Sequence, residues 1–272
     1  MRRAVAAVAV LGLLATGCAA AEAEPTSVLE ADRLVIGTSA DQPGIGLRSD
    51  AGGFEGFDID VSNQIAKRLG FAENDVRFVP VESGRQEEMI TSGEVDLLVA
   101  FYPIRPDRKV VMDFAGPYYE AHQDILVRKG TNSIGDVRDL QTKQMCDIPD
   151  SGAWERITLE RKVQPIHVTR DSWGECIELL RSGEVEAVST IDAILAGYLR
   201  EERARLEFVN APFTDERIGI GVPKGDHATC ESINRAIAAM YEDGTMQRLF
   251  DKWFGETGLV TPNTVPQFEG CE

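Results

Sequence analysis

The chain has few of the residues that build catalytic and metal sites. It contains three histidines, His122, His167 and His227, and none of them stands in an HxH or HExxH spacing. Its five cysteines form no CxxC pair. Zinc sites and histidine-based catalytic sites usually need such groupings. The sequence therefore predicts no metal site, no cofactor and no catalytic residue.

Basic residues are also scarce relative to acidic ones. The 272 residues include 28 Lys and Arg against 45 Asp and Glu, which gives a net charge of −17. This surplus repels phosphate backbones and anionic lipid surfaces. Nucleic acid is therefore excluded as a partner, and an anionic ligand would need arginines placed close to it.

No apolar run is long enough to cross a bilayer. The run from Ala4 to Leu14 follows two arginines and leads into Leu14-Ala15-Thr16-Gly17-Cys18, the layout of a secretory signal. It resembles the bacterial lipobox, which implies a signal peptide over 1–17, a diacylglycerol on the thiol of Cys18, and an extracytoplasmic protein tethered to the outer face of a membrane. The alternative is an ordinary cleaved signal with a stray cysteine. Residues 18–30 are predicted to be a flexible tether.

Four further cysteines predict disulfide bonds. An even number of cysteines in an exported chain indicates two bonds, and four cysteines allow three pairings. Sequential pairing is favoured because each bond then lies within one structural unit, and each would stabilise the fold by about 3 to 4 kcal/mol. The four residues are Cys146, Cys176, Cys230 and Cys271.

Length and internal repetition indicate two α/β lobes. The segment Ser92–Leu97 (SGEVDL) recurs as Ser182–Ala187 (SGEVEA), each time between a helical pattern and a short apolar strand. The strands Asp124–Arg128 and Ile218–Val222 are predicted to carry the chain between the lobes and to act as a two-strand hinge. The predicted lobes are residues 31–121 with 219–257 and residues 122–218, followed by a tail at 258–272 held by a disulfide.

The segment Ser92–Tyr119 reads as one wall of a ligand cleft. Its apolar run Val95–Ala100 has the length of a strand, and Pro103 and Pro106 then break the backbone. Arg108 therefore falls at the carboxyl end of the strand, where ligands of open α/β sheets bind, and a guanidinium suits a carboxylate. The alternative is an ordinary surface arginine.

Several motifs together resemble the family 3 extracellular solute-binding proteins of bacterial ABC importers, the polar amino-acid binders. The resemblance implies a periplasmic-binding-protein type II fold with two lobes that close on an amino acid. The cysteine layout resembles that of glutamate-type binders of high-GC Gram-positive bacteria. The motifs occur in family order: Asp41-Gln42-Pro43-Gly44, Gly56-Phe57-Asp58-Ile59-Asp60, Gly93–Asp96, Asp107-Arg108-Lys109, Asp113–Tyr119, Ala193–Tyr198, Pro223-Lys224-Gly225 and Tyr241–Thr245.

The resemblance also implies ligand-binding roles. Arg108 matches the family arginine that grips the α-carboxylate of the ligand. Ser151 and Gly152 match a loop that donates a hydroxyl and amides from the other lobe, with a simple turn as the alternative. Arg85 matches an arginine of the glutamate-type binders that takes a side-chain carboxylate, with a solvent-facing arginine as the alternative.

The chain departs from the family pattern at several of these positions. Pro103 stands where a Ser or Thr is usual, so one contact to the carboxylate is expected to be missing. The family aspartate that binds the ammonium follows directly after a pair such as Ser189-Thr190, but here Ile191 intervenes before Asp192. Either Asp192 takes over or the ammonium has no such partner. Phe101 is expected to fill part of the pocket.

These features leave three candidate functions. The first is a monomeric, lipid-anchored protein that feeds a polar amino acid or a related carboxylate to an ABC permease. The second is a ligand sensor or pseudo-receptor that uses the same clamp to signal to a membrane partner. The third, an enzyme such as an extracytoplasmic dehydratase, has little support because no catalytic set can be placed.

Overall fold

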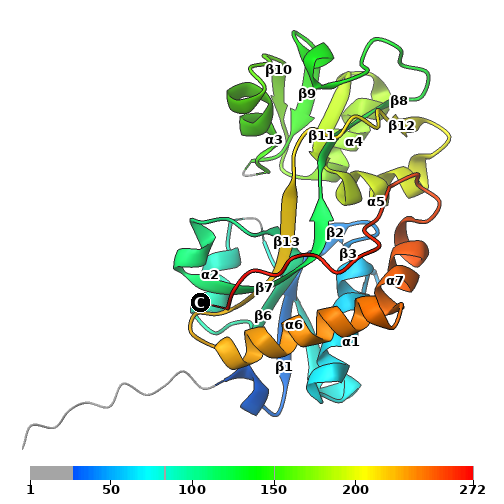
Figure 1. Ribbon diagram of the computed structural model, residues 1–272. Coiled ribbons are helices and arrows are strands. Elements are labelled where there is room, and N and C mark those ends of the chain that lie inside the picture. Colours follow the sequence, from blue (N-terminus) through cyan, green and yellow to red (C-terminus); the bar gives the residue numbers. More distant parts are fainter. Residues whose placement is uncertain (1–26, 83, 150, 272) are drawn as a thin grey trace, which may run out of the picture.

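A computed structural model describes residues 27–82, 84–149 and 151–271. These residues form two five-stranded sheets, each flanked by helices, and a small three-stranded sheet. The two large sheets lie in separate halves of an elongated molecule (Figure 1). The predicted signal peptide and Cys18 lie outside the described residues. The fold class expected from the sequence, two α/β units with mixed sheets, is confirmed.

The first sheet has the strand order β5-β1-β6-β13-β7. Strands β5, β1 and β6 are parallel, whereas β13 runs antiparallel to both of its neighbours. Its strands are β1 (Leu34–Thr38), β5 (Val76–Pro80), β6 (Leu97–Pro103), β7 (Met112–Ala121) and β13 (Glu216–Pro223). Its helices are α1 (Phe57–Leu69), α2 (Gln86–Thr91), α6 (His227–Glu242) and α7 (Thr245–Phe254), and the small sheet comprises β2 (Asp41–Gln42), β3 (Gly46–Arg48) and β4 (Phe54–Glu55).

The second sheet repeats this arrangement with the order β10-β9-β11-β8-β12. Here β10, β9 and β11 are parallel and β8 is antiparallel to β11 and β12. Its strands are β8 (Gln123–Arg128), β9 (Gln144–Asp147), β10 (Ile166–Thr169), β11 (Ala187–Ile191) and β12 (Leu206–Phe208). Its helices are α3 (Ala153–Glu155), which continues as a π-helical turn over Arg156–Glu160, α4 (Trp173–Ser182) and α5 (Asp192–Glu202).

The repeated hexapeptide occupies equivalent places in the two sheets. In the first copy, Asp96 accepts a hydrogen bond from the amide of Val35 on β1, at 2.7 Å. In the second, Glu186 accepts one from the amide of Gln144 on β9, at 3.0 Å. Each acidic residue thus caps the start of the neighbouring parallel strand, which accounts for the recurrence of the motif.

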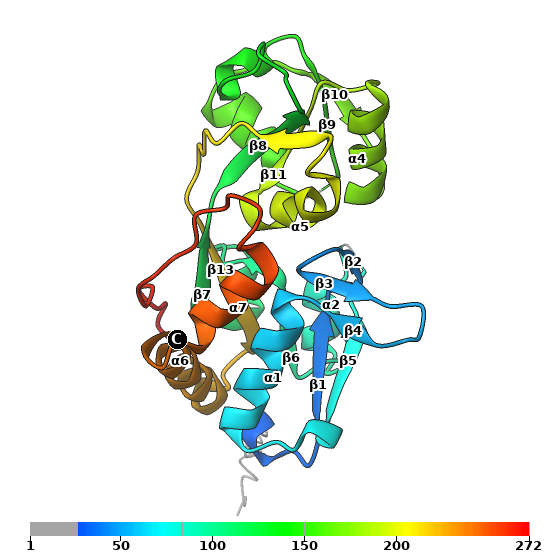
Figure 2. The same ribbon diagram turned by 90° about the vertical axis from the view of Figure 1, so that its right-hand side faces the viewer.

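The second sheet is inserted into the first. The chain leaves the first sheet at the end of β7 and returns at β13, and these two strands pair with Ala121 opposite Glu216 (Figure 2). The connecting pair is therefore β7 and β13. The predicted hinge strand Asp124–Arg128 is instead β8, inside the second sheet between β11 and β12, because its apolar side chains are buried there.

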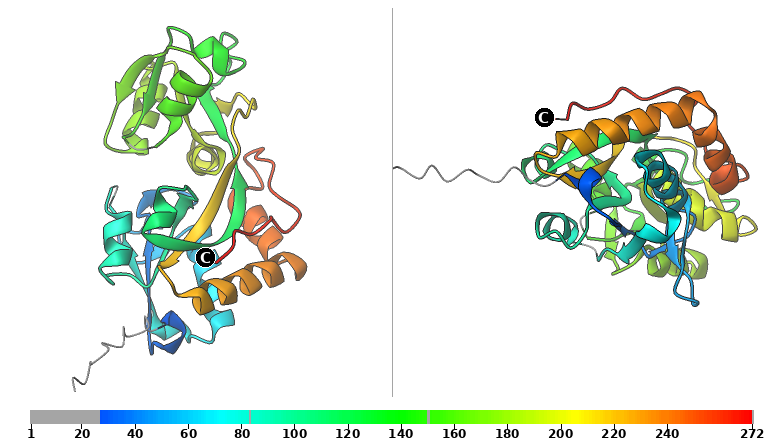
Figure 3. Two further views of the ribbon diagram at one scale, coloured as in Figure 1. Left: turned by 60° about the vertical axis from the view of Figure 1, so that its left-hand side comes forward. Right: turned by 90° about the horizontal axis from the view of Figure 1, so that it is seen from below.

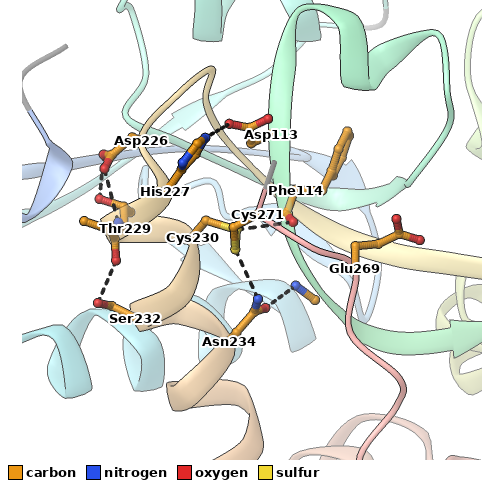
Figure 4. The surroundings of a disulfide bond; sticks show 12 residues. Asp113, Phe114, Asp226, His227, Thr229, Cys230, Ser232, Asn234, Glu269 and Cys271 are labelled. Atoms are coloured by element: carbon orange, nitrogen blue, oxygen red, sulfur yellow. Dashed lines mark hydrogen bonds and ion pairs between the residues drawn. A yellow bond between two sulfur atoms is a disulfide. The ribbon is translucent and has the colours of Figure 1, made fainter. Parts of the chain in front are cut away.

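Both ends of the described chain are attached to the first turn of α6. The N-cap residue Asp226 accepts hydrogen bonds from the Ser27 hydroxyl and the Val28 amide, at 2.8 and 2.7 Å. One turn later Cys230 forms a disulfide with Cys271 (Figure 4), and the C-terminal segment runs back along α6 to reach it (Figure 3). The predicted tether was therefore too long: residues 28–30 form a short 3₁₀ helix because Val28 is buried.

Helix α5 of the second half packs on the first half. Its Gly197 lies against the loop after β2, where an added Cβ would come within 1.8 Å of the Pro43 carbonyl oxygen. The Tyr198 hydroxyl donates to the carbonyl of Asp41 at 3.1 Å. Arg203, at the end of α5, pairs with Glu256 at 2.8 Å. These contacts fix one side of the space between the two sheets.

Candidate ligand-binding site

A cavity of about 890 Å³ lies between the two halves. Its walls come from the carboxyl ends of β6 and β11, from the loop that follows β9, and from the first residues of α2. The sequence predicted that ligand-binding residues lie at the carboxyl end of β6, and the cavity is at that edge. Of the predicted site residues, the cavity is lined by Phe101, Arg108, Ser151, Gly152, Thr190 and the neighbouring Pro103 and Ile191.

Arg108 is held against the cavity wall by three contacts. Its guanidinium lies 3.7 Å from the centre of the Tyr102 ring and donates to the carbonyl of Pro103 at 2.8 Å. Its Nε lies 3.7 Å from a carboxylate oxygen of Glu87. Only 12% of the side chain is exposed, and this burial lowers the pKa of Arg108. A partly desolvated, fixed guanidinium of this kind suits a carboxylate ligand.

Phe101 forms the floor of the cavity beside Arg108. Its ring is buried and packs on Tyr119 and Tyr118, with centroid distances of 5.3 and 6.3 Å. Its backbone has φ = 49°, in the left-handed region that β-strand residues rarely adopt. The expectation that Phe101 fills part of the pocket is consistent with this position.

The loop after β9 brings Ser151 and Gly152 to the opposite wall. Gly152 has φ = 79° and begins α3, a conformation that favours glycine. The Ser151 hydroxyl donates to Asp147 at 3.3 Å and accepts from the Ala153 amide. Asp147 also lies 2.5 Å from Nε2 of His167. The loop is therefore ordered by a carboxylate at the end of β9.

The disulfide Cys146–Cys176 reinforces the same strand end. It joins β9 to α4 and lies directly before Asp147 at the end of the strand. With Cys230–Cys271, the structure contains the sequential pairing that was favoured from the sequence.

Asp192 does not line the cavity, although Thr190 and Ile191 do. The residue is 4% exposed, and its carboxylate accepts hydrogen bonds from the amides of His122 and Ala193, at 3.2 and 2.7 Å. Burial raises the pKa of Asp192 to about 7. The residue begins α5, and its side chain binds backbone amides at the junction between β11 and α5. The predicted ammonium partner is thus separated from the cavity.

Arg85 likewise lies outside the set of lining residues. Its guanidinium pairs with Glu88 at 3.4 Å and Glu94 at 3.2 Å on the surface of the first half. Arg85 therefore fits the alternative given above, a solvent-facing arginine, and not a ligand-binding residue of this cavity.

Several charged residues of the cavity were not predicted from the sequence. Arg156 donates to both carboxylate oxygens of Glu216, at 3.0 and 3.2 Å, and so links the turn after α3 to β13. Glu87 projects from α2 beside Arg108. No local motif marks these residues, because they meet only through the fold.

Two buried amide oxygens on the cavity wall have no hydrogen-bond partner among the described residues. They are Oε1 of Gln42 and Oε1 of Gln123. Within the same part of the chain, no group of three or more His, Cys, Asp or Glu side chains is arranged to hold a metal ion. No helix there is long and apolar enough to span a membrane.

Comparison with known proteins decides the family. Residues 34–256 match the bacterial extracellular solute-binding proteins, family 3. The chain belongs to this family. The glutamate-binding protein of Corynebacterium efficiens is 32% identical over 97% of this chain and 93% of its own length. The ABC transporter glutamine-binding protein of Bacillus subtilis is 32% identical over 85% of this chain and 84% of its own length.

Solved structures support the same assignment. An ancestral arginine-binding protein bound to arginine is 33% identical, covers 83% of this chain and 99% of its own, and superposes with a TM-score of 0.72. The family 3 relatives are solute-binding proteins for amino acids, and this chain has the fold of an extracellular solute-binding protein.

Proposed function

We propose that this protein captures a polar amino acid of the glutamate, glutamine or aspartate type between its two halves and delivers it to an ABC permease. The observation that carries the proposal is Arg108, only 12% exposed, at the wall of a cavity that both halves line. The named amino acids follow from what the Corynebacterium and Bacillus relatives bind. The protein acts by binding and release and has no catalytic role.

The arrangement favours binding by enclosure. A carboxylate that leaves water needs a fixed cationic partner and further hydrogen-bond donors. Arg108 supplies the cation from the first half, and the hydroxyl-bearing residues Ser151 and Thr190 line the cavity from the second. A ligand that contacts both walls stabilises their approach, because it binds the closed arrangement better than the open one.

The proposal includes the placement of the protein. Residues 1–17 act as a signal peptide, Cys18 carries the lipid, and the monomeric protein stays at the outer face of the membrane. The two lobes are residues 31–121 with 219–257 and residues 122–218, and residues 258–272 form the tail. The sequence around Cys18 and the family of extracellular solute-binding proteins support this placement.

Calorimetric titration with the three amino acids tests the assignment. Native protein is expected to bind one molecule, and Arg108→Ala is expected to weaken binding at least about a hundredfold, because the ligand carboxylate loses a charged hydrogen bond and a cation. Arg105→Ala is the matched control, since Arg105 lines the same cavity but is exposed and paired with Asp107. Undiminished binding by Arg108→Ala would rule out the assigned role of Arg108.

A second candidate function is a ligand sensor on the same scaffold. It is favoured by one observation: the apolar Ile191 lines the cavity while Asp192 is sealed outside it. A sensor is expected to copurify from membranes with a signalling protein. Recovery of permease subunits alone would count against this alternative.

A further inference from the structure

The cavity needs a partner for the amino group of an amino acid. An ammonium that is buried without a carboxylate or several oxygen acceptors is strongly disfavoured. Asp192 is outside the cavity and Ile191 is apolar, so neither can provide a negative charge there. The carboxylates that do line the cavity are Glu87, Asp107, Glu155, Glu160 and Glu216.

Most of these carboxylates are engaged or face solvent. Asp107 is 65% exposed and pairs with Arg105. Glu216 is held in two-pronged fashion by Arg156, which also binds Glu160 at 2.5 Å. Glu155, the last residue of α3, is exposed.

Glu87 lies next to that site and keeps one oxygen available. Its Oε1 accepts from the Tyr102 hydroxyl at 2.5 Å and lies 3.7 Å from Nε of Arg108. Within the described part of the chain, its Oε2 accepts no hydrogen bond. The side chain is 38% exposed, on the cavity wall. The hydroxyl of Tyr102 and the backbone of α2 fix its position.

We propose that Glu87 binds the amino group of the ligand while Arg108 binds its carboxylate; this inference rests on the proposed function. The two groups of an α-amino acid are attached to one carbon, so their partners must be neighbours. The pair Arg108 and Glu87, 3.7 Å apart, meets that condition. Glu87 thereby supplies the negative charge for the amino group that the apolar Ile191 cannot supply.

The pair also selects for the zwitterion. Glu87 neutralises Arg108 in the unliganded protein, so a carboxylate without an amino group would meet a negative charge beside the guanidinium. An α-amino acid brings a positive charge to Glu87 at the same time. The site therefore discriminates between an amino acid and the same molecule without its amino group.

The test compares Glu87→Gln with native protein by calorimetric titration. Three ligand pairs are used: glutamate with glutarate, glutamine with glutaramate, and aspartate with succinate. In the variant, affinity for the bound amino acid is expected to fall about tenfold or more, because a charged hydrogen bond is lost. Affinity for its partner without the amino group is expected to stay equal or rise. Glu88→Gln, which changes the exposed neighbour paired with Arg85, is expected to alter neither.

The outcomes separate this inference from the function on which it rests. If native protein binds an amino acid and Glu87→Gln binds it equally well, the role of Glu87 is overturned and the proposed function stands. If native protein prefers the ligands without an amino group, the role of Glu87 is overturned as well. If native protein binds none of the six compounds, the proposed function fails and the inference fails with it. Retained binding of the analogue by the variant shows that it is folded.

Discussion

Asp58 is a fully buried carboxyl group of the first half. It lies in the first turn of α1, accepts a hydrogen bond from the Tyr118 hydroxyl at 2.7 Å, and has its second oxygen unpartnered among the described residues. Burial raises its pKa from 3.8 to about 7. In the folded protein Asp58 therefore stays protonated at pH values where the unfolded chain has already released that proton.

The shift predicts that Asp58 makes the fold less stable as pH rises. Below about pH 4 both states hold the proton and the group has no effect. Between about pH 4 and pH 7 only the folded state holds it, so stability falls by up to about 4 kcal/mol and then stays constant. Asp58→Asn cannot ionise and is expected to remove this loss.

Melting temperatures at pH 4.5 and pH 8 measure the effect. The advantage of Asp58→Asn over native protein is expected to be larger at pH 8. An advantage that does not change with pH would show that Asp58 is ionised in the fold. Asp192, whose pKa burial also raises to about 7, adds a loss of the same sign in both proteins and does not affect the comparison.

Sequence reasoning located some site residues and missed others for a physical reason. Arg108 was identified because prolines end the strand before it, and a strand end has a known position in a sheet. The choice between Ile191 and Asp192 depends on which side chain faces the cavity where β11 becomes α5. A shift of one residue at that junction turns the opposite side chain toward the cavity, and only the three-dimensional structure shows which one faces it.

At the scale of elements, the contact of α5 with the loop after β2 depends on glycine. A Gly inside a helix is normally less stable than Ala by about 1 kcal/mol. At Gly197, however, a Cβ would lie 1.8 Å from the Pro43 carbonyl oxygen. The helix and the loop would have to separate, which outweighs the gain in helix propensity.

Gly197→Ala is therefore expected to destabilise the protein by about 1 to 3 kcal/mol, measured by urea unfolding. Gly174→Ala in α4 is the matched control. A Cβ there meets its nearest atom at 3.8 Å, so this change is expected to be neutral or stabilising. Equal effects of the two substitutions would contradict the importance of the inter-half contact.

The elements show what periodicity can and cannot predict. Helix α1 was recognised from its apolar face and the glycine that ends it, and Gly70 does adopt a left-handed conformation at φ = 99°. Strand β6 was expected to end at Ala100, before Pro103, but it continues to Pro103. Its pairing with β1 ends at Leu98. Pro103 has no N–H, but no hydrogen bond to β1 is lost there because the two strands no longer pair. Pairing between distant strands decides such limits.

At the scale of the whole molecule, the insertion of one half into the other makes the first half separable in principle. Strands β7 and β13 are antiparallel, and Ala121 pairs with Glu216. A two-residue Asn-Gly turn in place of residues 122–215 would join them as an ordinary hairpin. This shortened protein is expected to unfold cooperatively and to bind no amino acid, because half of the cavity walls is missing.

Circular dichroism during heating and calorimetric titration check the two expectations. A gradual loss of signal without a transition would show that the first half needs the contacts of α5. Amino-acid binding by the shortened protein would contradict the location of the site between the halves.

The attachment of both described ends to the first turn of α6 affects the order in which the chain can assemble. The second sheet is built from the continuous stretch between β8 and β12. The first sheet needs β13 as well as β1. The contact of Ser27 with Asp226 and the disulfide of Cys271 with Cys230 can form only when α6 is present. If the chain becomes available from its amino end, the second half starts later in the sequence but has all of its strands first. The half that begins the chain is completed last, and its closing step is the disulfide at Cys271.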